Sequence, residues 1–411
     1  DIAPGEVFSR KRLTDLTQKI SDRLGEDGYA NASVNPVPEK NPDDSIIGFT
    51  LYVNSGQRVY VRRININGNL DTRDEVIRRE LRQMEGSWYS VKDINRSKRR
   101  LDLLGFFSEV IINTIPVPGT ADQVDLEVKV VERMTGSFSI GVGFSSADRL
   151  LLQLSMAQSN FLGTGNSVNL VASTGKVNET YELGFTDPYA TDDGVSRTYK
   201  LGKRDTDVSS LVVSAFSSST ESASINFGVP LTEYDRIFYG VGFEQTGITL
   251  GLNPTREYQE FVDLNGKNNT IIPLTVGWSR DKRDSALFPT DGLLQRFASE
   301  LSTPLGDITY YNFTYKSEWY RPLTETFTLR LGGSLAYAED FDGKQLPFYK
   351  KFYAGGASSL RGYQVSSLGP KDSTGLALGG KRRLLSQAEL LFPWPGLNMG
   401  DAIRFSAFID G

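Results

Sequence analysis

Arg361 is the residue whose type and position most clearly predict a specific ionic site. It lies in the stretch from Lys351 to Tyr363, within a long connection between two segments of alternating polar and apolar residues. If those segments form a membrane barrel, the guanidinium is cut off from bulk water, where an unpaired ion costs several kcal/mol. Glu389 and Asp410, each on the polar side of a later segment, are the candidate partners. The pattern therefore predicts an arginine paired with carboxylates inside the protein.

Composition removes most kinds of catalytic and metal site. The chain of 411 residues contains no histidine and no cysteine, which excludes disulfides, thiolate ligands, the common zinc sites and histidine-based catalysis. The formal net charge of −5 gives no electrostatic reason to expect nucleic acid as a partner. We therefore expect neither an enzyme nor a cofactor or metal site.

The apolar residues predict a membrane protein built from strands. No window approaches the roughly 18 to 20 apolar residues of a membrane helix, but a barrel strand needs only about 9 to 11 residues with every second one apolar. After Thr135 the hydrophobic period is 2, most clearly at Tyr311, Phe313, Tyr315 and Trp319. A soluble sandwich shows the same alternation. Small or hydrophilic residues on the polar side, aromatic residues at strand ends, and connections that alternate between short and long favour the barrel.

Smaller α+β modules precede this region. Residues 9–24 have helical spacing and are followed by two strand-like runs. A second module has the order β-α-α-β-β, with helices expected from Asp71 to Met84 and from Ser90 to Leu104. The first module therefore matches the back half of the second. We expect domain boundaries that give residues 1–55, 56–134 and 135–411.

The strand count predicts an incomplete barrel. Counting from Phe138 gives about thirteen strands, the last from Ala402 to Asp410, whereas bacterial single-chain barrels have an even number. The sequence also begins at Asp1 without a signal peptide. We therefore expect a mature fragment that lacks its leader, earlier domains and final strands.

Several phrases of the sequence resemble the Omp85 superfamily of outer-membrane proteins. They are residues 81–86, 104–107, 160–165, 185–189 and 288–292 and the loop from Leu360 to Tyr363, and together they cover nearly the whole chain in order. The family often has valine and phenylalanine where this loop has Leu360 and Tyr363. The resemblance implies POTRA domains, namely the second half of the fourth and the complete fifth, followed by an antiparallel transmembrane β-barrel that has about 16 strands when complete.

The resemblance also implies a role for the loop arginine. Arg361, with Gly362 and Tyr363 beside it, is expected to fold back into the lumen and pair with Glu389 and Asp410. Carboxylates suit the bidentate geometry of a guanidinium, which lysine does not reproduce. The alternative is that Arg361 lies in solvent, as most loop arginines do.

The first barrel strand is implied to be one side of a lateral gate. Its residues are Ser137, Phe138, Ser139, Ile140, Gly141, Val142, Gly143 and Phe144. Weak pairing of this strand would present backbone N–H and C=O groups to an incoming client strand. Gly141 and Gly143 either weaken the pairing or simply leave space in the lumen.

Glu80 is implied by the same resemblance to contact a lipoprotein partner from the fifth POTRA domain. The alternative is a solvated residue on a helix face, which is the usual place of a charged helix residue.

The function that the resemblance implies is the assembly of other membrane proteins. It would fold and insert β-barrel clients into the bacterial outer membrane, with its POTRA domains in the periplasm and without nucleotide. The expected partners are the clients, lipoproteins of the assembly machine and outer-membrane lipids. The alternative is a secretion pore of the two-partner type, which shares POTRA domains and the arginine loop. A protease or phospholipase barrel leans on histidine, and a passive porin leaves the POTRA units unexplained.

Overall fold

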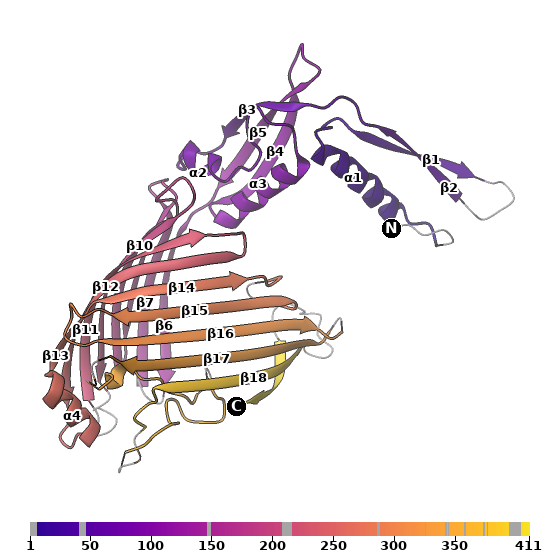
Figure 1. Cartoon of the computed structure of the whole chain (residues 1–411). Coiled ribbons are helices and arrows are strands. Elements are labelled where there is room, and N and C mark those ends of the chain that lie inside the picture. The colour runs from indigo at the N-terminus through magenta and orange to yellow at the C-terminus, as the bar shows by residue number, and fades with distance from the viewer. Residues whose placement is uncertain are drawn as a thin grey trace. The chain divides into compact units, whose positions relative to one another are not determined.

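The structure is a computed structural model of the whole chain (Figure 1). It describes residues 6–40, 47–145, 149–207, 216–285, 288–324, 326–341, 343, 345–356, 359–372, 375, 377–393 and 404–411. Ala402, where we expected the last strand to begin, lies outside the described residues. The chain divides into two compact units, the first formed by residues 1–136 and 158–166 and the second by residues 137–157 and 167–411.

The first unit contains the two expected α+β modules. Its elements are α1 (Arg10–Glu26), β1 (Ser33–Lys40), β2 (Ile47–Asn54), β3 (Tyr60–Asn67), α2 (Asp74–Arg78), α3 (Val91–Leu104), β4 (Phe107–Pro116) and β5 (Gln123–Glu132). Ser9 caps α1 by accepting a hydrogen bond from the N–H of Arg12, and Ser90 caps α3 in the same way. The predicted order β-α-α-β-β is present from β3 to β5, and α1, β1 and β2 supply the corresponding back half.

The second module is held by an apolar core. Its sheet has the order β3-β5-β4, in which β3 runs parallel to β5 and β4 runs antiparallel to it. Every second residue of β5 from Val124 to Val130 is buried against the helices, as are Ile77 and Leu101. Full burial of each such side chain stabilises the fold by about 1.5–3 kcal/mol.

The first helix of this module is shorter than the sequence predicts. We expected it to run from Asp71 to Met84, but α2 runs only from Asp74 to Arg78. Beyond Arg79 the backbone hydrogen bonds tighten, because the N–H groups of Glu80 and Leu81 donate to carbonyls three residues back. The N–H of Arg82 then donates to the hydroxyl of Ser97 at 2.7 Å. The chain then turns back to β3, where the N–H of Gly86 donates to the carbonyl of Val61.

A carboxylate at the end of β5 organises the loop before α2. Glu132 accepts hydrogen bonds from the N–H groups of Leu70, Asp71 and Thr72 at 3.1, 2.9 and 2.7 Å. The hydroxyl of Thr72 in turn accepts a hydrogen bond from the amide of Asn160. These hydrogen bonds hold the loop against the end of β5.

The second unit is dominated by one large antiparallel sheet. Its strands are β6 (Gly136–Ser145), β7 (Arg149–Phe161), β8 (Asn166–Thr174), β9 (Asn178–Asp187), β10 (Ser196–Asp207), β11 (Phe216–Pro230), β12 (Asp235–Leu250), β13 (Asn268–Ile271), β14 (Pro273–Asp281), β15 (Gly292–Ser302), β16 (Tyr310–Pro322), β17 (Thr328–Asp340), β18 (Arg382–Pro393) and β19 (Arg404–Asp410). Successive strands pair in one path from β6 to β19, and β13 pairs with β12 beside that path. The sheet curves, so that its later strands pass in front of β6 and β7 in Figure 1.

The faces of this sheet are reversed relative to a water-soluble protein. Val276, Leu331 and Leu335 are 54%, 41% and 43% exposed, whereas Glu318 and Glu389 are 7% and 9% exposed. Charged residues are seldom buried unless they are paired. One face of the sheet therefore suits apolar surroundings, and the other holds paired charges.

The long connections carry α4 (Arg256–Asn265) and the 3₁₀ helix η2 (Phe348–Lys350). Aromatic side chains from both helices are buried together, with the ring centroids of Tyr258 and Phe348 at 4.3 Å. Among the described residues, no helix combines the length and apolar character that a membrane crossing requires.

Candidate functional site

The register of β18 and β19 places the two candidate carboxylates on one face. Asp410 is opposite Gln387, and Phe408 is opposite Glu389. Side chains of a strand alternate between faces, so Glu389 and Asp410 are diagonal neighbours across the strand pair. The side chains of Glu389 and Asp410 are only 11% and 4% exposed.

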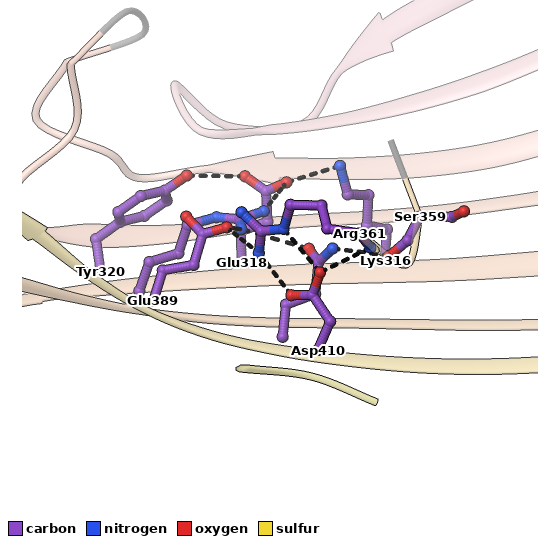
Figure 2. Close-up of polar contacts among 9 residues, drawn as sticks. Lys316, Glu318, Tyr320, Ser359, Arg361, Glu389 and Asp410 are labelled. Atoms are coloured by element: carbon purple, nitrogen blue, oxygen red, sulfur yellow. Dashed lines mark hydrogen bonds and ion pairs between the residues drawn. The ribbon is translucent and has the colours of Figure 1, made fainter. Parts of the chain in front are cut away.

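Arg361 reaches both carboxylates from the loop between β17 and β18 (Figure 2). Its Nε and Nη2 donate to the two oxygens of Asp410 at 2.7 and 2.5 Å, and its backbone N–H donates to Asp410 Oδ2 at 3.1 Å. Its Nη2 also lies 2.6 Å from Glu389 Oε1. The structure thus brings together the three charged residues that the sequence singled out. The alternative of a solvated Arg361 is wrong.

Gly362 and Tyr363 serve the anchor through the backbone. Gly362 has φ +87°, a conformation that side chains rarely adopt. The carbonyl of Tyr363 accepts the N–H of Gly356, while its side chain is 55% exposed. The backbone of these two residues therefore forms part of the turn that carries Arg361.

An aromatic ring completes the arginine site. The guanidinium carbon of Arg361 lies 3.5 Å from the ring centroid of Phe408. A cation over an aromatic face contributes about 0.5–2 kcal/mol, more as water is removed. Sequence reasoning missed Phe408, although its parity with Asp410 on the same strand is the signal that places both on the inner face.

Further charges extend the site along β16 and β17. Glu318 lies 2.7 Å from Lys316 and 3.1 Å from Arg330, and Arg330 lies 3.1 Å from Glu389. Figure 2 shows Lys316, Glu318, Glu389, Arg361 and Asp410 gathered in one group of polar contacts. We call the row from Lys316 through Glu318, Arg330, Glu389 and Arg361 to Asp410 the ionic row.

Charges alternate along the ionic row, and their formal sum is zero. Three cations and three carboxylates take part, and each inner member contacts an opposite charge on both sides. Removing one partner of a buried ion pair costs about 3–5 kcal/mol, because the remaining charge loses its compensation. Arg361 is the one member supplied by the loop, so the loop completes the neutralisation of the sheet.

The loop arginine stays charged. Hydrogen bonds to Asp410 hold the pKa of Arg361 above its ordinary value, while burial acts in the opposite direction. The anchor is therefore ionic at every physiological pH.

The predicted gate strand corresponds to β6. Its apolar residues Phe138, Ile140, Val142 and Phe144 are 65%, 69%, 70% and 83% exposed. Within the described part of the chain, β6 pairs with β7 alone, and Ser139 contacts Ser155 through hydroxyls at 2.6 Å.

The two glycines of β6 are not required by crowding. A Cβ at Gly141 would lie 3.6 Å from Gln153 Cβ, and one at Gly143 would lie 3.8 Å from the side chain of Leu151. These are ordinary van der Waals distances. Glycine at these positions therefore lowers strand propensity without relieving a clash with neighbouring residues.

Glu80 lies two residues beyond the end of α2, outside the helix in which the sequence analysis expected it. It is 3% exposed, and its Oε2 is 2.5 Å from Nη2 of Arg100 on α3. The alternative of a solvated helix residue is therefore wrong. Contact between Glu80 and a partner protein remains a prediction.

Two protein families match this sequence. The Omp85 superfamily domain matches residues 160–411. The chain belongs to the Omp85 superfamily. The POTRA family, described as a surface antigen variable number repeat, matches residues 1–56 and 59–133 of this Omp85 protein.

Two curated relatives with the same name illustrate the similarity. The outer membrane protein assembly factor BamA of Neisseria meningitidis serogroup B is 38% identical over 99% of this chain and 53% of its own length. That of Nitratidesulfovibrio vulgaris is 28% identical over 91% of this chain and 46% of its own. The chain thus spans about half the length of these curated relatives. The motifs quoted from the sequence resemble BamA in particular, and that prediction is confirmed.

A solved structure bears on the fold. The crystal structure of BamA from Haemophilus ducreyi lacking POTRA domains 1–3 matches with a TM-score of 0.81 at 31% identity. The match covers 100% of this chain and 82% of that one. The prediction of POTRA modules followed by an antiparallel transmembrane β-barrel is confirmed for this Omp85 protein.

Proposed function

We propose that the protein folds and inserts β-barrel clients into the bacterial outer membrane, without nucleotide, as an assembly factor of the BamA type. The observation that carries this proposal is the loop arginine on Glu389 and Asp410, in a chain 38% identical to a BamA. The modules of residues 1–55 and 56–134 are POTRA domains in the periplasm, and residues 135–411 form the barrel in the outer membrane.

The anchor holds the loop in place while the barrel works. Arg361 joins the loop to two adjacent strands, β18 and β19, through ion pairs that include a bidentate contact. Partly buried pairs of this kind are screened less by salt than exposed ones. The loop therefore keeps its position while the edges of the sheet change their pairing.

The first strand, β6, is one side of a lateral gate. Its outer residues face away from the protein and its pairing is on one side only among the described residues. A client strand adds to such an edge through backbone hydrogen bonds, which need no particular client sequence. Gly141 and Gly143 keep the pairing of this strand weak enough to exchange.

The partners are β-barrel clients, outer-membrane lipids and the lipoproteins of the BAM complex, BamD among them. Glu80 contributes to the lipoprotein contact by orienting Arg100, to which it is paired at 2.5 Å. The long guanidinium of Arg100 is 35% exposed and is the part of the pair that a partner reaches.

The proposal is tested by client folding into liposomes that contain the full-length protein. Arg361→Ala removes the side-chain contacts but keeps the backbone N–H contact with Asp410, so the barrel stays folded and client folding slows. The charge swap of Arg361→Asp with Asp410→Arg restores part of the rate. Arg382→Ala, at an exposed arginine of the neighbouring strand β18, is the matched control and leaves the rate unchanged.

Two results contradict the proposal. The ionic anchor has no role if Arg361→Asp alone, Asp410→Arg alone and the swap all fold clients as fast as the parent. The function is instead that of a secretion pore if a partner polypeptide accumulates inside the vesicles rather than in their membrane.

The gate is tested by strengthening its strand. Gly141→Val and Gly143→Val introduce a β-branched residue where space allows, so tighter pairing of β6 slows client insertion. Gly333→Val on β17 is the matched control, because its Cβ would also meet only an ordinary contact at 4.0 Å. Equal rates for all three variants would remove the gate role of β6.

A further inference from the structure

A second cation of the same loop, Lys350, is largely buried and pairs with strands other than those that hold Arg361. Lys350 ends η2, and its Nζ lies 2.8 Å from Oε2 of Glu244 on β12 and 3.2 Å from Oε1 of Glu300 on β15. The three side chains are 18%, 24% and 22% exposed. Removing a lysine and two carboxylates from water costs desolvation free energy, which their mutual attraction must offset.

The carboxylates depend on this lysine. Glu244 and Glu300 come from strands on either side of β14, and like charges at such a site disfavour each other. Tyr310 donates its hydroxyl to Glu300, and Lys350 Nζ lies 5.6 Å from the ring centroid of Tyr310. Burial lowers the pKa of Lys350, but Glu300 and Glu244 outweigh it and raise the pKa above the ordinary value. Lys350 is thus held in its charged form.

Apolar packing accompanies the ion pair. Phe348, two residues before Lys350, is 1% exposed and packs its ring against those of Phe216 and Tyr258 at 4.5 and 4.3 Å. Lys351, which follows Lys350, pairs with Glu257 of α4. The base of the loop is therefore seated on β12, β15 and α4.

A short ladder connects this base to the arginine. Phe352 exchanges backbone hydrogen bonds with Gly380 at 2.9 and 2.8 Å, and the N–H of Leu368 donates to the carbonyl of Ala354. The N–H of Gly356 then donates to the carbonyl of Tyr363. A displacement of the base is therefore passed along hydrogen-bonded backbone to the turn that carries the guanidinium.

We propose that Lys350 is a positioning residue: held between Glu244 and Glu300, it fixes the base of the loop and sets where Arg361 meets β18 and β19. The two anchors lie on different strands, so the loop spans the sheet from β12 to β19. This inference rests on the proposed function for its biological meaning, but its geometry is testable alone.

The experiment measures the position of the loop tip directly. Residues 1–411 contain no cysteine. Cysteines are therefore introduced at Val365, which is 80% exposed, and at Val241 of β12, after replacement of any cysteine outside these residues. Spin labels on the two cysteines report one distance in the liposome-reconstituted full-length protein. Lys350→Met keeps the length of the side chain and removes its charge. We expect one narrow distance peak for the parent protein. In Lys350→Met the ratio of displaced to parent-like loop positions should rise about fivefold or more, which is the lower end of the usual coupling between two sites.

Rescue separates positioning from general damage. Lys350→Arg keeps the charge and restores the parent distance, and Lys350→Glu with Glu244→Lys restores it in part. Lys371→Met, at an exposed lysine of the same loop, leaves the peak unchanged. Heat-dependent migration on a gel shows that each variant is a folded barrel. Variants that do not fold are replaced by Glu244→Gln, for which a shifted peak has the same meaning.

Each outcome decides the inference. An unchanged peak in Lys350→Met, or a changed peak that Lys350→Arg does not restore, overturns it. If the parent protein does not accelerate client folding at all, the proposed function fails, and the distance measurement still tells whether Lys350 positions the loop. If the distance shifts and client folding slows in the same variants, both proposals stand.

Discussion

The second POTRA module and the large sheet differ in which residues they bury: the module buries apolar side chains, and the sheet buries paired charges. In the module, Ile77 and Leu101 are fully buried and its charged residues lie mostly at the surface. In the sheet, Leu331 is 41% exposed while Glu318 is 7% exposed. The module is stabilised by removing apolar surface from water. The sheet leaves its apolar surface on the outside, and paired charges stabilise its inner face. The arrangement of that inner face therefore depends on the geometry of the ion pairs.

The largest expected effect comes from removing one carboxylate of the ionic row. Asp410→Ala leaves Arg361 with Glu389 alone, and we expect a loss of about 3–5 kcal/mol in the free energy of unfolding. Urea unfolding in liposomes, followed by tryptophan fluorescence, measures it. In the double variant with Arg361→Ala, the added loss is much smaller, because the charge that Asp410 compensates is gone. Simple additivity of the two losses would mean that the contact does not stabilise the sheet.

The second-largest expected effect comes from a substitution in the core of the second POTRA module. Leu101→Ala leaves a cavity in the apolar core, and we expect a loss of about 2–5 kcal/mol. The amides of β5 should then exchange with deuterium faster, while those of β16 and β17 keep their protection. Equal loosening of both regions would show that the two are stabilised together.

A third test places a lysine at two exposed leucines, one expected to face lipid and the other water. Leu331→Lys puts a charge on the outer face of the sheet, where a lysine in a lipid-facing strand costs about 2–4 kcal/mol near the bilayer midplane. Leu70→Lys is the control, because Leu70 is 93% exposed in the first unit and faces water; its change should stay within about 0.5 kcal/mol. Equal unfolding midpoints for the two variants would contradict the assignment of the outer face to lipid.

The smallest effect is the pH dependence of the loop before α2. Burial raises the pKa of Glu132, but hydrogen bonds from Thr72, Asp71 and Leu70 outweigh it and the pKa lies below the ordinary 4.5. Its stabilising contribution is therefore complete above pH 4.5 and is lost as the pH falls through the lowered pKa.

Hydrogen exchange at the amides of Leu70, Asp71 and Thr72, corrected for intrinsic rates, measures this contribution. Protection should fall on acidification in the parent and be low at every pH in Glu132→Gln. An acid-dependent loss of protection that persists in Glu132→Gln would assign the effect to another group.

Strand parity made part of the site predictable. A strand alternates with a period of 2, so the sequence alone puts Glu389 and Asp410 on one face, and an arginine in the preceding loop had to find partners there. The remainder of the ionic row depends on register: Arg330 is opposite Glu389 because of how β17 pairs with β18, and nothing in either strand alone states that pairing.

Irregular segments resisted prediction for a different reason. Lys350 lies in a loop without periodicity, so its carboxylates on β12 and β15 could not be anticipated from spacing. The helix expected from Asp71 to Met84 ends at Arg78, and past this end the N–H of Arg82 donates to the hydroxyl of Ser97 instead of to a helical carbonyl. In both cases the segment makes a contact that is distant in sequence.

The alternation of charge in the ionic row constrains how the protein can vary. Each inner member touches two opposite charges, so a change of sign at an inner member creates two repulsions at once. Glu389 therefore cannot drift to lysine unless Arg330 and Arg361 change with it. We expect orthologous chains to keep these positions or to exchange them in compensated groups, whereas the outer face can exchange one apolar residue for another without such compensation.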